Sequence, residues 1–371
     1  MKTNAAVLWE IDGDWTIEEV DLDGPKDGEV LISFEATGLC HSDHHVRTGD
    51  LAGLPLPMIG GHEGAGVVQE VGPSVHGLAV GDHVVTSFLP ACGRCRWCAS
   101  GHQNLCDLGA LILMGVQTDG TYRRRLNGKD VGTMAGIGSF SQYGTLSESS
   151  VIKVDDDLPL SRACLLGCGV MTGWGSAVNT ADVSPGDTVV VIGFGGIGSG
   201  AVQGARLAGA ERIVVVDLVE DKRDKAIQFG ATHFATSMSE ATELVSELTR
   251  GVMADSALLT MGLLEGPMID DALNIVSKNG AVVMTALASM ADVSPVLPMT
   301  FMTLFQKRLL GSLYGEANPR ADIPKLLSLY REGKLMLDET VTAEYKLNDI
   351  NEGYADMLAG RNIRGVVIHD H

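Results

Sequence analysis

Positive charge is scarce in this chain of 371 residues. It has 27 Lys and Arg against 47 Asp and Glu, which gives a formal net charge of -20 at pH 7. A surface of this kind repels phosphate backbones and anionic headgroups, and the chain has no compact basic run beyond Arg123, Arg124 and Arg125. We therefore expect neither a nucleic acid nor a membrane as its partner.

Long apolar runs are missing as well. The segment "MKTNAAVLWEIDGDW" lacks the apolar stretch of a secretory signal, and an acidic residue stands at position 10. Two uncharged stretches, residues 163–181 and 188–205, contain too many glycine and polar residues for a lipid-facing helix. The sequence therefore predicts a cytoplasmic protein, in which seven reduced cysteines serve metal binding or catalysis before disulfides.

The pattern of apolar residues, glycine and proline along the chain changes near residue 170. Before this point, β-branched runs such as "EVLISFEATG" and "DHVVTSFLP" alternate with Gly and Pro, which is typical of strands and turns. After it, apolar runs such as "DTVVVIG" and "RIVVVD" alternate with helical patterns, which predicts βαβ units and a parallel sheet. The apolar "IRGVVIH" near the end resembles the first half again. We expect an α/β protein with domains over 1–169 and 170–314, and a return to the first domain over 315–371.

The stretch "CGRCRWCASGHQNLC" contains four cysteines at C-x2-C-x2-C-x7-C spacing: Cys92, Cys95, Cys98 and Cys106. Four thiolates in one loop can surround a tetrahedral zinc ion and leave no open position, which is typical of a structural site. The alternative, unrelated buried cysteines or disulfides, does not explain this spacing in a reducing compartment. The stretch therefore predicts a structural zinc site.

The stretch "GLCHSDHHVRTGD", residues 38–50, holds one cysteine, three histidines and two aspartates in what we interpret as a loop. It supplies Cys40, and "GGHEGAGVVQEVG" supplies His62 beside Glu63. Two thiolates and one imidazole leave the fourth zinc position to water or substrate, as a catalytic site requires. A histidine beside a glutamate is more often an ordinary hydrogen-bonded pair, so these residues alone leave both interpretations open.

The stretch "VVVIGFGGIGSG" carries Gly193, Gly195 and Gly198 as G-x-G-x-x-G between a predicted strand and a predicted helix. Asp217 closes the next strand. Such glycines let the backbone approach a pyrophosphate at the helix N-terminus, while the carboxylate accepts hydrogen bonds from ribose hydroxyls. The same carboxylate repels a 2′-phosphate, so the sequence favours NAD over NADP.

Together with "LLGCGVMTGWGSAV", these motifs resemble the zinc-containing medium-chain alcohol dehydrogenases along nearly the whole chain. The resemblance implies a mainly β, GroES-like catalytic domain and a doubly wound Rossmann domain. It implies that Cys40, His62 and Cys168 bind the catalytic zinc, with Glu63 close behind the metal. Cys164 has no counterpart in the family and is expected to be a core residue.

The resemblance also implies a proton relay from Ser42, beside the bound alcohol, through the nicotinamide ribose to His45. His44 is then expected to be only solvated, and Leu51 and Phe88 to line an apolar substrate pocket. The residues that match cofactor contacts of the family are His41, Thr172, Gly193, Gly195, Gly196, Ile197, Gly198, Asp217, Lys222 and Arg364.

Within the family the sequence is most similar to the actinobacterial nitrosoaniline (NDMA)-dependent group, in which a tightly held NAD is reoxidised in place by an external carrier. We expect a homo-oligomer, dimer or tetramer, that uses two zinc ions and NAD to convert a primary or secondary alcohol into an aldehyde or ketone. One alternative is a thiol-dependent formaldehyde dehydrogenase, which usually has a tyrosine at the place of His45 and an acid at that of Leu51. A zinc-free quinone reductase or a non-catalytic NAD-binding relative would not need the metal ligands and the relay.

Overall fold

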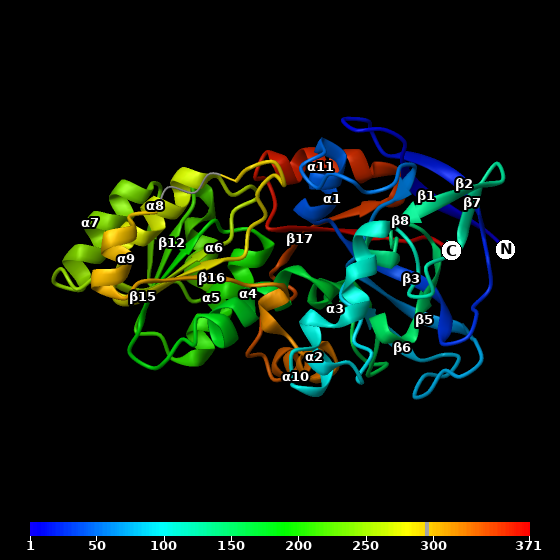
Figure 1. Cartoon of the computed structure of the whole chain (residues 1–371), viewed down its shortest axis with the longest axis horizontal. Coiled ribbons are helices and arrows are strands. Elements are labelled where there is room, and N and C mark those ends of the chain that lie inside the picture. Colours follow the sequence, from blue (N-terminus) through cyan, green and yellow to red (C-terminus); the bar gives the residue numbers. More distant parts are fainter. Residues whose placement is uncertain (294–296) are drawn as a thin grey trace. The chain divides into compact units, whose positions relative to one another are not determined.

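The computed structural model describes residues 1–293 and 297–371 (Figure 1). The chain forms two compact units, of which the first consists of Met1–Cys168 and Asn318–His371 and the second of Gly169–Ala317. The sequence placed these boundaries after residues 169 and 314. The first unit is therefore built from two separate segments of the chain, and the second unit is inserted between them.

The first unit is mainly β. One sheet closes into a barrel of β1 (Lys2–Leu8), β2 (Thr16–Leu22), β7 (Arg124–Leu126), β8 (Lys129–Thr133) and β4 (Met58–Ile59). The other sheet has the order β10 (Val151–Val154), β6 (His83–Thr86), β5 (Gly64–Val71), β3 (Glu29–Gly38), β18 (Arg364–Ile368) and β17 (Val341–Lys346), and β9 (Tyr143–Ser147) also pairs with β3. Val30, Ile32 and Phe34 of β3 are fully buried in its core.

Helices of the first unit are short, except near its C-terminal end. They are α1 (His41–Thr48), α2 (Arg96–Ala99), α3 (Leu160–Ala163), α10 (Pro319–Arg331) and α11 (Ile350–Leu358). The loop expected over residues 38–50 was wrong, because most of it is α1. Gly49 ends this helix in the left-handed conformation, with φ 78°. Two turns with few apolar residues give no helical period, so the sequence pattern could not reveal α1.

The second unit contains a six-stranded sheet in which every neighbouring pair is parallel. Its order is β13 (His233–Ala235), β12 (Arg212–Val216), β11 (Thr188–Ile192), β14 (Ala254–Leu259), β15 (Val276–Met284) and β16 (Arg308–Gly311). The helices are α4 (Gly169–Gly175), α5 (Gly196–Ala208), α6 (Arg223–Phe229), α7 (Met238–Leu248), α8 (Gly266–Ile275) and α9 (Met299–Phe305). All residues of β11 are buried, as expected for a central parallel strand covered on both faces. The predicted α/β fold, a doubly wound sheet with a mainly β second domain, is confirmed.

Glycines allow α4 and α5 to pack very closely in the second unit. A Cβ atom at Gly173 would lie 1.9 Å from the carbonyl oxygen of Ile197, and one at Gly200 would lie 2.4 Å from that of Val170. Any side chain at these positions would push the helices apart. The contact therefore fixes the start of α5, which follows the glycine-rich turn. Among the residues described, no helix has the length and apolar character needed to cross a bilayer.

Candidate active site and metal centres

The four clustered cysteines meet in space as their spacing predicts. The Sγ atoms of Cys92, Cys95, Cys98 and Cys106 all lie within 4.8 Å of one another. Backbone N–H groups donate to sulfur within the cluster, from Cys95 to Cys92 at 3.3 Å and from Cys92 to Cys106 at 3.4 Å. Hydrogen bonds from the backbone of Cys98 and Asp107 lower the pKa of Cys95 to about 6. Burial raises the pKa of Cys98 to about 12 and also raises the pKa of Cys106. The arrangement of the four sulfur atoms fits a closed zinc site.

A second, fully buried cluster consists of Cys40, His62, Glu63 and Cys168, with one ligand atom of each within 4.8 Å of the others. Cys40 immediately precedes α1, His62 and Glu63 immediately precede β5, and Cys168 ends the first segment of the unit. A hydrogen bond from Cys168 and the proximity of His62 hold the pKa of Cys40 well below its ordinary value, despite the opposing effect of burial. The cluster therefore favours a thiolate beside an imidazole, the donor set that a catalytic zinc requires.

Asp43 orients the His62 ring. Its Oδ2 atom lies 3.0 Å from His62 Nδ1, and its Oδ1 atom accepts a hydrogen bond of 2.7 Å from the Gly61 N–H. Burial lowers the pKa of His62, but Asp43 and Cys40 outweigh this effect and raise it. With Nδ1 turned to the carboxylate, Nε2 faces the sulfur atoms, which is the usual orientation of a zinc-bound histidine. No sequence motif singled out Asp43, although it stands only three residues after Cys40.

Glu63 is neutralised by Arg364. The two side chains form a buried ion pair between Arg364 Nη2 and Glu63 Oε2. Gly38 makes room for this pair, because a Cβ atom there would lie 2.1 Å from Glu63 Oε2. The family resemblance assigned Arg364 to the cofactor, and the structure places its guanidinium in the metal site, where it balances the charge of Glu63 and the nearby thiols.

The proposed relay residues lie on α1. Cys40 Sγ and Ser42 Oγ lie 3.6 Å apart, so Ser42 stands beside the metal cluster. His45 is buried, and its Nδ1 atom lies 3.1 Å from Asp50 Oδ2. Burial is the main reason that the pKa of His41 falls to about 4. The expectation that His44 is only solvated was wrong, because its ring is half-buried and stacks on Tyr354 with centroids 6.3 Å apart.

The two expected pocket residues have different surroundings. The Phe88 ring meets the His62 ring edge-on, with centroids 5.8 Å apart, so it lies next to the metal cluster. Leu51 packs against the apolar core that contains Val46 and Met58. Cys164 is fully buried and donates a weak hydrogen bond of 3.5 Å to the Ser161 carbonyl oxygen, as expected for a core residue.

The glycine-rich turn of the second unit has the backbone that a dinucleotide site needs. Gly193 has a φ of 97°, and a Cβ atom at Gly198 would lie 2.0 Å from the Gly193 carbonyl oxygen. Gly195 precedes α5, whose first two residues are Gly196 and Ile197, and a Cβ atom at Gly195 would meet nothing within 4 Å. The turn is therefore compact on its inner side and open on its outer side, where a phosphate can approach the helix N-terminus.

Asp217 holds this turn together as well. Its carboxylate accepts hydrogen bonds from the N–H groups of Phe194 at 2.7 Å and Val219 at 3.0 Å. Lys222 forms an ion pair of 3.0 Å with the same carboxylate. Asp217 and Lys222 therefore form one charged pair at the end of β12.

Thr172, which the family resemblance also assigned to the cofactor, lies in α4. Its carbonyl oxygen accepts a 2.7 Å hydrogen bond from the Ser176 hydroxyl.

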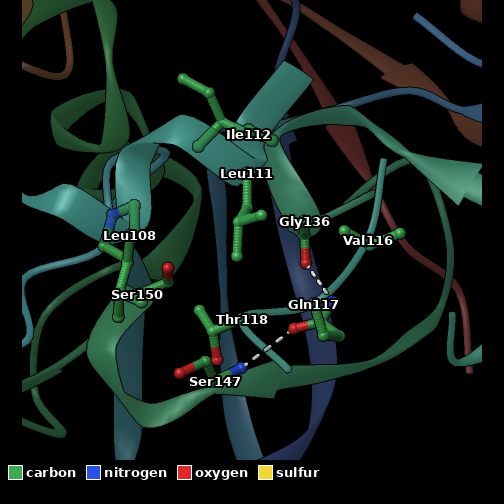
Figure 2. Close-up of a pocket in the computed structure, with 11 residues that line it drawn as sticks. Leu108, Leu111, Ile112, Val116, Gln117, Thr118, Gly136, Ser147 and Ser150 are labelled. Carbon is green, nitrogen blue, oxygen red and sulfur yellow. Dashed lines mark hydrogen bonds between the residues drawn. The ribbon is translucent and has the colours of Figure 1, made fainter. Parts of the chain in front are cut away.

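A further pocket of the first unit contains none of the metal-cluster residues (Figure 2). Leu108, Leu111, Ile112 and Val116 make much of its wall apolar. Gln117 also lines the pocket, and its side chain donates to the Gly136 carbonyl oxygen at 2.5 Å and accepts from the Ser147 N–H at 3.2 Å (Figure 2). Both the NH2 group and the oxygen of the Gln117 amide therefore form hydrogen bonds with the backbone. The side chain serves as a structural bridge between Gly136 and Ser147.

Comparison with known proteins agrees with the two zinc sites and the nucleotide-binding turn. Residues 26–156 match the alcohol dehydrogenase GroES-like domain, and residues 196–332 match the zinc-binding dehydrogenase family. The chain is 52% identical over 369 residues to an NDMA-dependent alcohol dehydrogenase of Amycolatopsis methanolica. The alignment covers 100% of this chain and 99% of the relative. The chain belongs to the zinc-containing alcohol dehydrogenase family.

Two further relatives support this membership. Alcohol dehydrogenase B of Mycobacterium tuberculosis is 49% identical over 368 residues, covering 99% of this chain and 98% of its own. A crystal structure of an alcohol dehydrogenase zinc-binding domain protein from Burkholderia ambifaria covers 100% of both chains, with a TM-score of 0.93 and 32% identity. The protein is thus a zinc-dependent alcohol dehydrogenase with a four-cysteine structural zinc site, a catalytic zinc site and the nucleotide-binding fold of its family.

Proposed function

We propose that the protein oxidises a primary or secondary alcohol to an aldehyde or ketone by hydride transfer to NAD. The observation that carries this proposal is the buried cluster of Cys40, His62 and Cys168, which offers three ligands and is backed by Asp43 and the ion pair of Glu63. A zinc ion held there supplies Lewis acidity, which lowers the pKa of a coordinated hydroxyl group.

The proton of the alcohol needs a path out of the buried site. Ser42 lies beside Cys40 and can accept and donate a proton through its hydroxyl, while the His45 imidazole stands three residues further along α1. A neutral imidazole can accept a proton near neutral pH, where water is a poor base. We therefore propose that Ser42 and His45 are the two ends of the relay, bridged by the cofactor ribose.

Replacing His45 by glutamine tests this relay. We expect alcohol oxidation to slow most at low to neutral pH, by about 100-fold or less, because water and buffer partly replace a base near the end of a relay. Small imidazole bases should restore part of the rate. His44→Gln is the matched control on the same helix and should leave the pH–rate profile unchanged. Overlapping profiles of His45→Gln and the parent would remove His45 from the mechanism.

We propose that the cofactor is NAD and that it stays bound during turnover, to be reoxidised by an external carrier. The name of the NDMA-dependent relative, at 52% identity, supports such an acceptor. Asp217 supports the choice of NAD, because its carboxylate stands at the end of β12, where it can accept from ribose hydroxyls and repel a phosphate.

Asp217→Asn should shift the ratio of NADP to NAD affinity by roughly tenfold or more toward NADP, because the charge is removed while one acceptor for the backbone remains. The affinities are measured by titrating each nucleotide into apoprotein freed of bound cofactor. Asp221→Asn, an exposed carboxylate four residues later, is the control and should leave the ratio as it is. An unchanged ratio in Asp217→Asn would contradict the proposed role.

We also propose a cytoplasmic homo-oligomer. Large apolar side chains between β15 and β16 and on α9 are exposed, among them Met290, Met299, Phe301 and Leu304, with exposed fractions of 56%, 77%, 53% and 68%. In the chain, α9 comes directly before β16, which is an edge strand of the parallel sheet. A second copy of the chain would remove this apolar surface from water.

A further inference from the structure

His45 has a carboxylate partner that follows α1 in the chain. Asp50 Oδ2 lies 3.1 Å from His45 Nδ1, and the Thr48 hydroxyl donates a 2.6 Å hydrogen bond to the same oxygen. Gly49, with a φ of 78°, turns the chain back toward the helix that it has just left. The Leu51 N–H then donates to the His45 carbonyl oxygen at 3.1 Å and secures this turn. The turn thus places Asp50 beside the imidazole.

From this geometry we propose that Asp50 is a positioning residue for the relay, an inference that rests on the function proposed for His45. Its carboxylate accepts the Nδ1–H of the neutral ring. This contact selects the tautomer whose Nε2 atom carries the lone pair, and it fixes the plane of the ring. A neutral imidazole accepts a relayed proton only through the nitrogen that carries no hydrogen, so the partner of Nδ1 decides whether Nε2 can work.

The surroundings of His45 favour this assignment. The imidazole rings of His41 and His44 and the guanidinium of Arg47 lie on the same helix, and Asp12 lies near His44. Asp50 is in direct contact with the His45 ring. The Thr48 hydroxyl and His45 lower the pKa of Asp50, so it remains an ionised acceptor. The His45 side chain is 4% exposed and that of Asp50 is 25% exposed, so water has limited access to the contact.

A double-mutant cycle tests the inference in the holoenzyme. Asp50→Ala should lower kcat for alcohol oxidation at low to neutral pH, by up to the factor found for His45→Gln, and leave KM nearly unchanged. The double variant should be no slower than His45→Gln alone, because Asp50 acts through His45. Added imidazole should restore part of the rate of Asp50→Ala. The control is Asp14→Asn, which breaks an exposed ion pair with Arg47 of the same helix, and it should leave kcat unchanged.

Two kinetic outcomes would overturn the inference. If Asp50→Ala slows the parent and His45→Gln by the same factor, Asp50 supports the fold and not the relay. If Asp50→Ala is silent while His45→Gln is slow, the relay stands and Asp50 has no part in it. A silent His45→Gln would refute the relay itself and the role of Asp50 with it.

A spectroscopic measurement tests the contact without any activity. Nitrogen-15 labelling of histidine and NMR at a pH where His45 is neutral distinguish the two ring tautomers, and His45→Gln identifies the signal. The parent should show the Nδ1–H tautomer, and Asp50→Ala should show a mixture or the Nε2–H tautomer. An Nε2–H ring in the parent would overturn the inference, whatever the kinetics show.

Discussion

Replacing Cys168 by alanine should abolish alcohol oxidation and reduce the zinc content from two ions per chain to one. The variant keeps His62 and Cys40 but loses one of three protein ligands in a site whose other residues are fully buried. Lewis-acid activation is worth several kcal/mol of transition-state stabilisation, so we expect kcat to fall by at least roughly 10³-fold. Elemental analysis and steady-state kinetics on the same sample measure both effects.

Cys164→Ala is the matched control, because this cysteine lies four residues earlier and is also buried. Its thiol donates to the Ser161 carbonyl oxygen, and it belongs to neither metal cluster. The variant should keep two zinc ions and most of its activity, with a small loss of thermal stability from the cavity. Two zinc ions in Cys168→Ala, or one in Cys164→Ala, would contradict the assignment of the catalytic ligands.

Replacing Cys106 by alanine should leave the catalytic zinc bound and destabilise the fold. The cysteine loop contains only α2, of four residues, and a three-residue 3-10 helix, Gln103–Leu105, which are too short to be stable alone. The zinc ion therefore supplies much of the stability of the loop, on the order of several kcal/mol. For a protein of this size we expect Tm to fall by roughly 10 °C or more.

Thermal unfolding and zinc content measure this effect, and Ser100→Ala is the control within the same loop. Ser100 donates a hydrogen bond to the Trp97 carbonyl oxygen at the exposed side of α2, so its removal should change Tm by little. If Cys106→Ala keeps the parent's Tm and both zinc ions, the cluster is not a structural zinc site.

Sequence patterns predicted the sites and the sheet best where all the interacting residues are close together in the chain. The four cysteines of the structural site lie within one short stretch, so their spacing alone restricts how they can meet. The parallel sheet was predictable because strands buried on both faces, such as β11 and β12, read as continuous apolar runs. Cys168 is far from Cys40 in the sequence, and only the resemblance to a family connected them.

Asp43 and Asp50 show what the sequence could not give. Both stand in a stretch that looked like a polar loop, where an aspartate is usually solvated. Asp43 reaches His62 because α1 begins at His41, and Asp50 reaches His45 because Gly49 reverses the chain. The contact of Asp43 depends on where a short helix begins and that of Asp50 on how it ends, and neither composition nor periodicity records these features. The closure of the barrel, in which β4 pairs with both β1 and β8, is likewise a non-local property.

The insertion of the second unit into the first sets an order for biosynthesis. Glu63 is made early, but Arg364, its buried counter-ion, belongs to β18, which pairs with β3 and is synthesised after the whole second unit. A nascent chain that has not reached β18 lacks the arginine that pairs with this carboxylate. The nucleotide-binding unit, whose strands are contiguous in the chain, can fold while the ribosome is still completing the other. We therefore expect the ion pair behind the catalytic zinc site to form last, and a chain truncated before β18 to yield a folded nucleotide unit and a metal site that lacks Arg364.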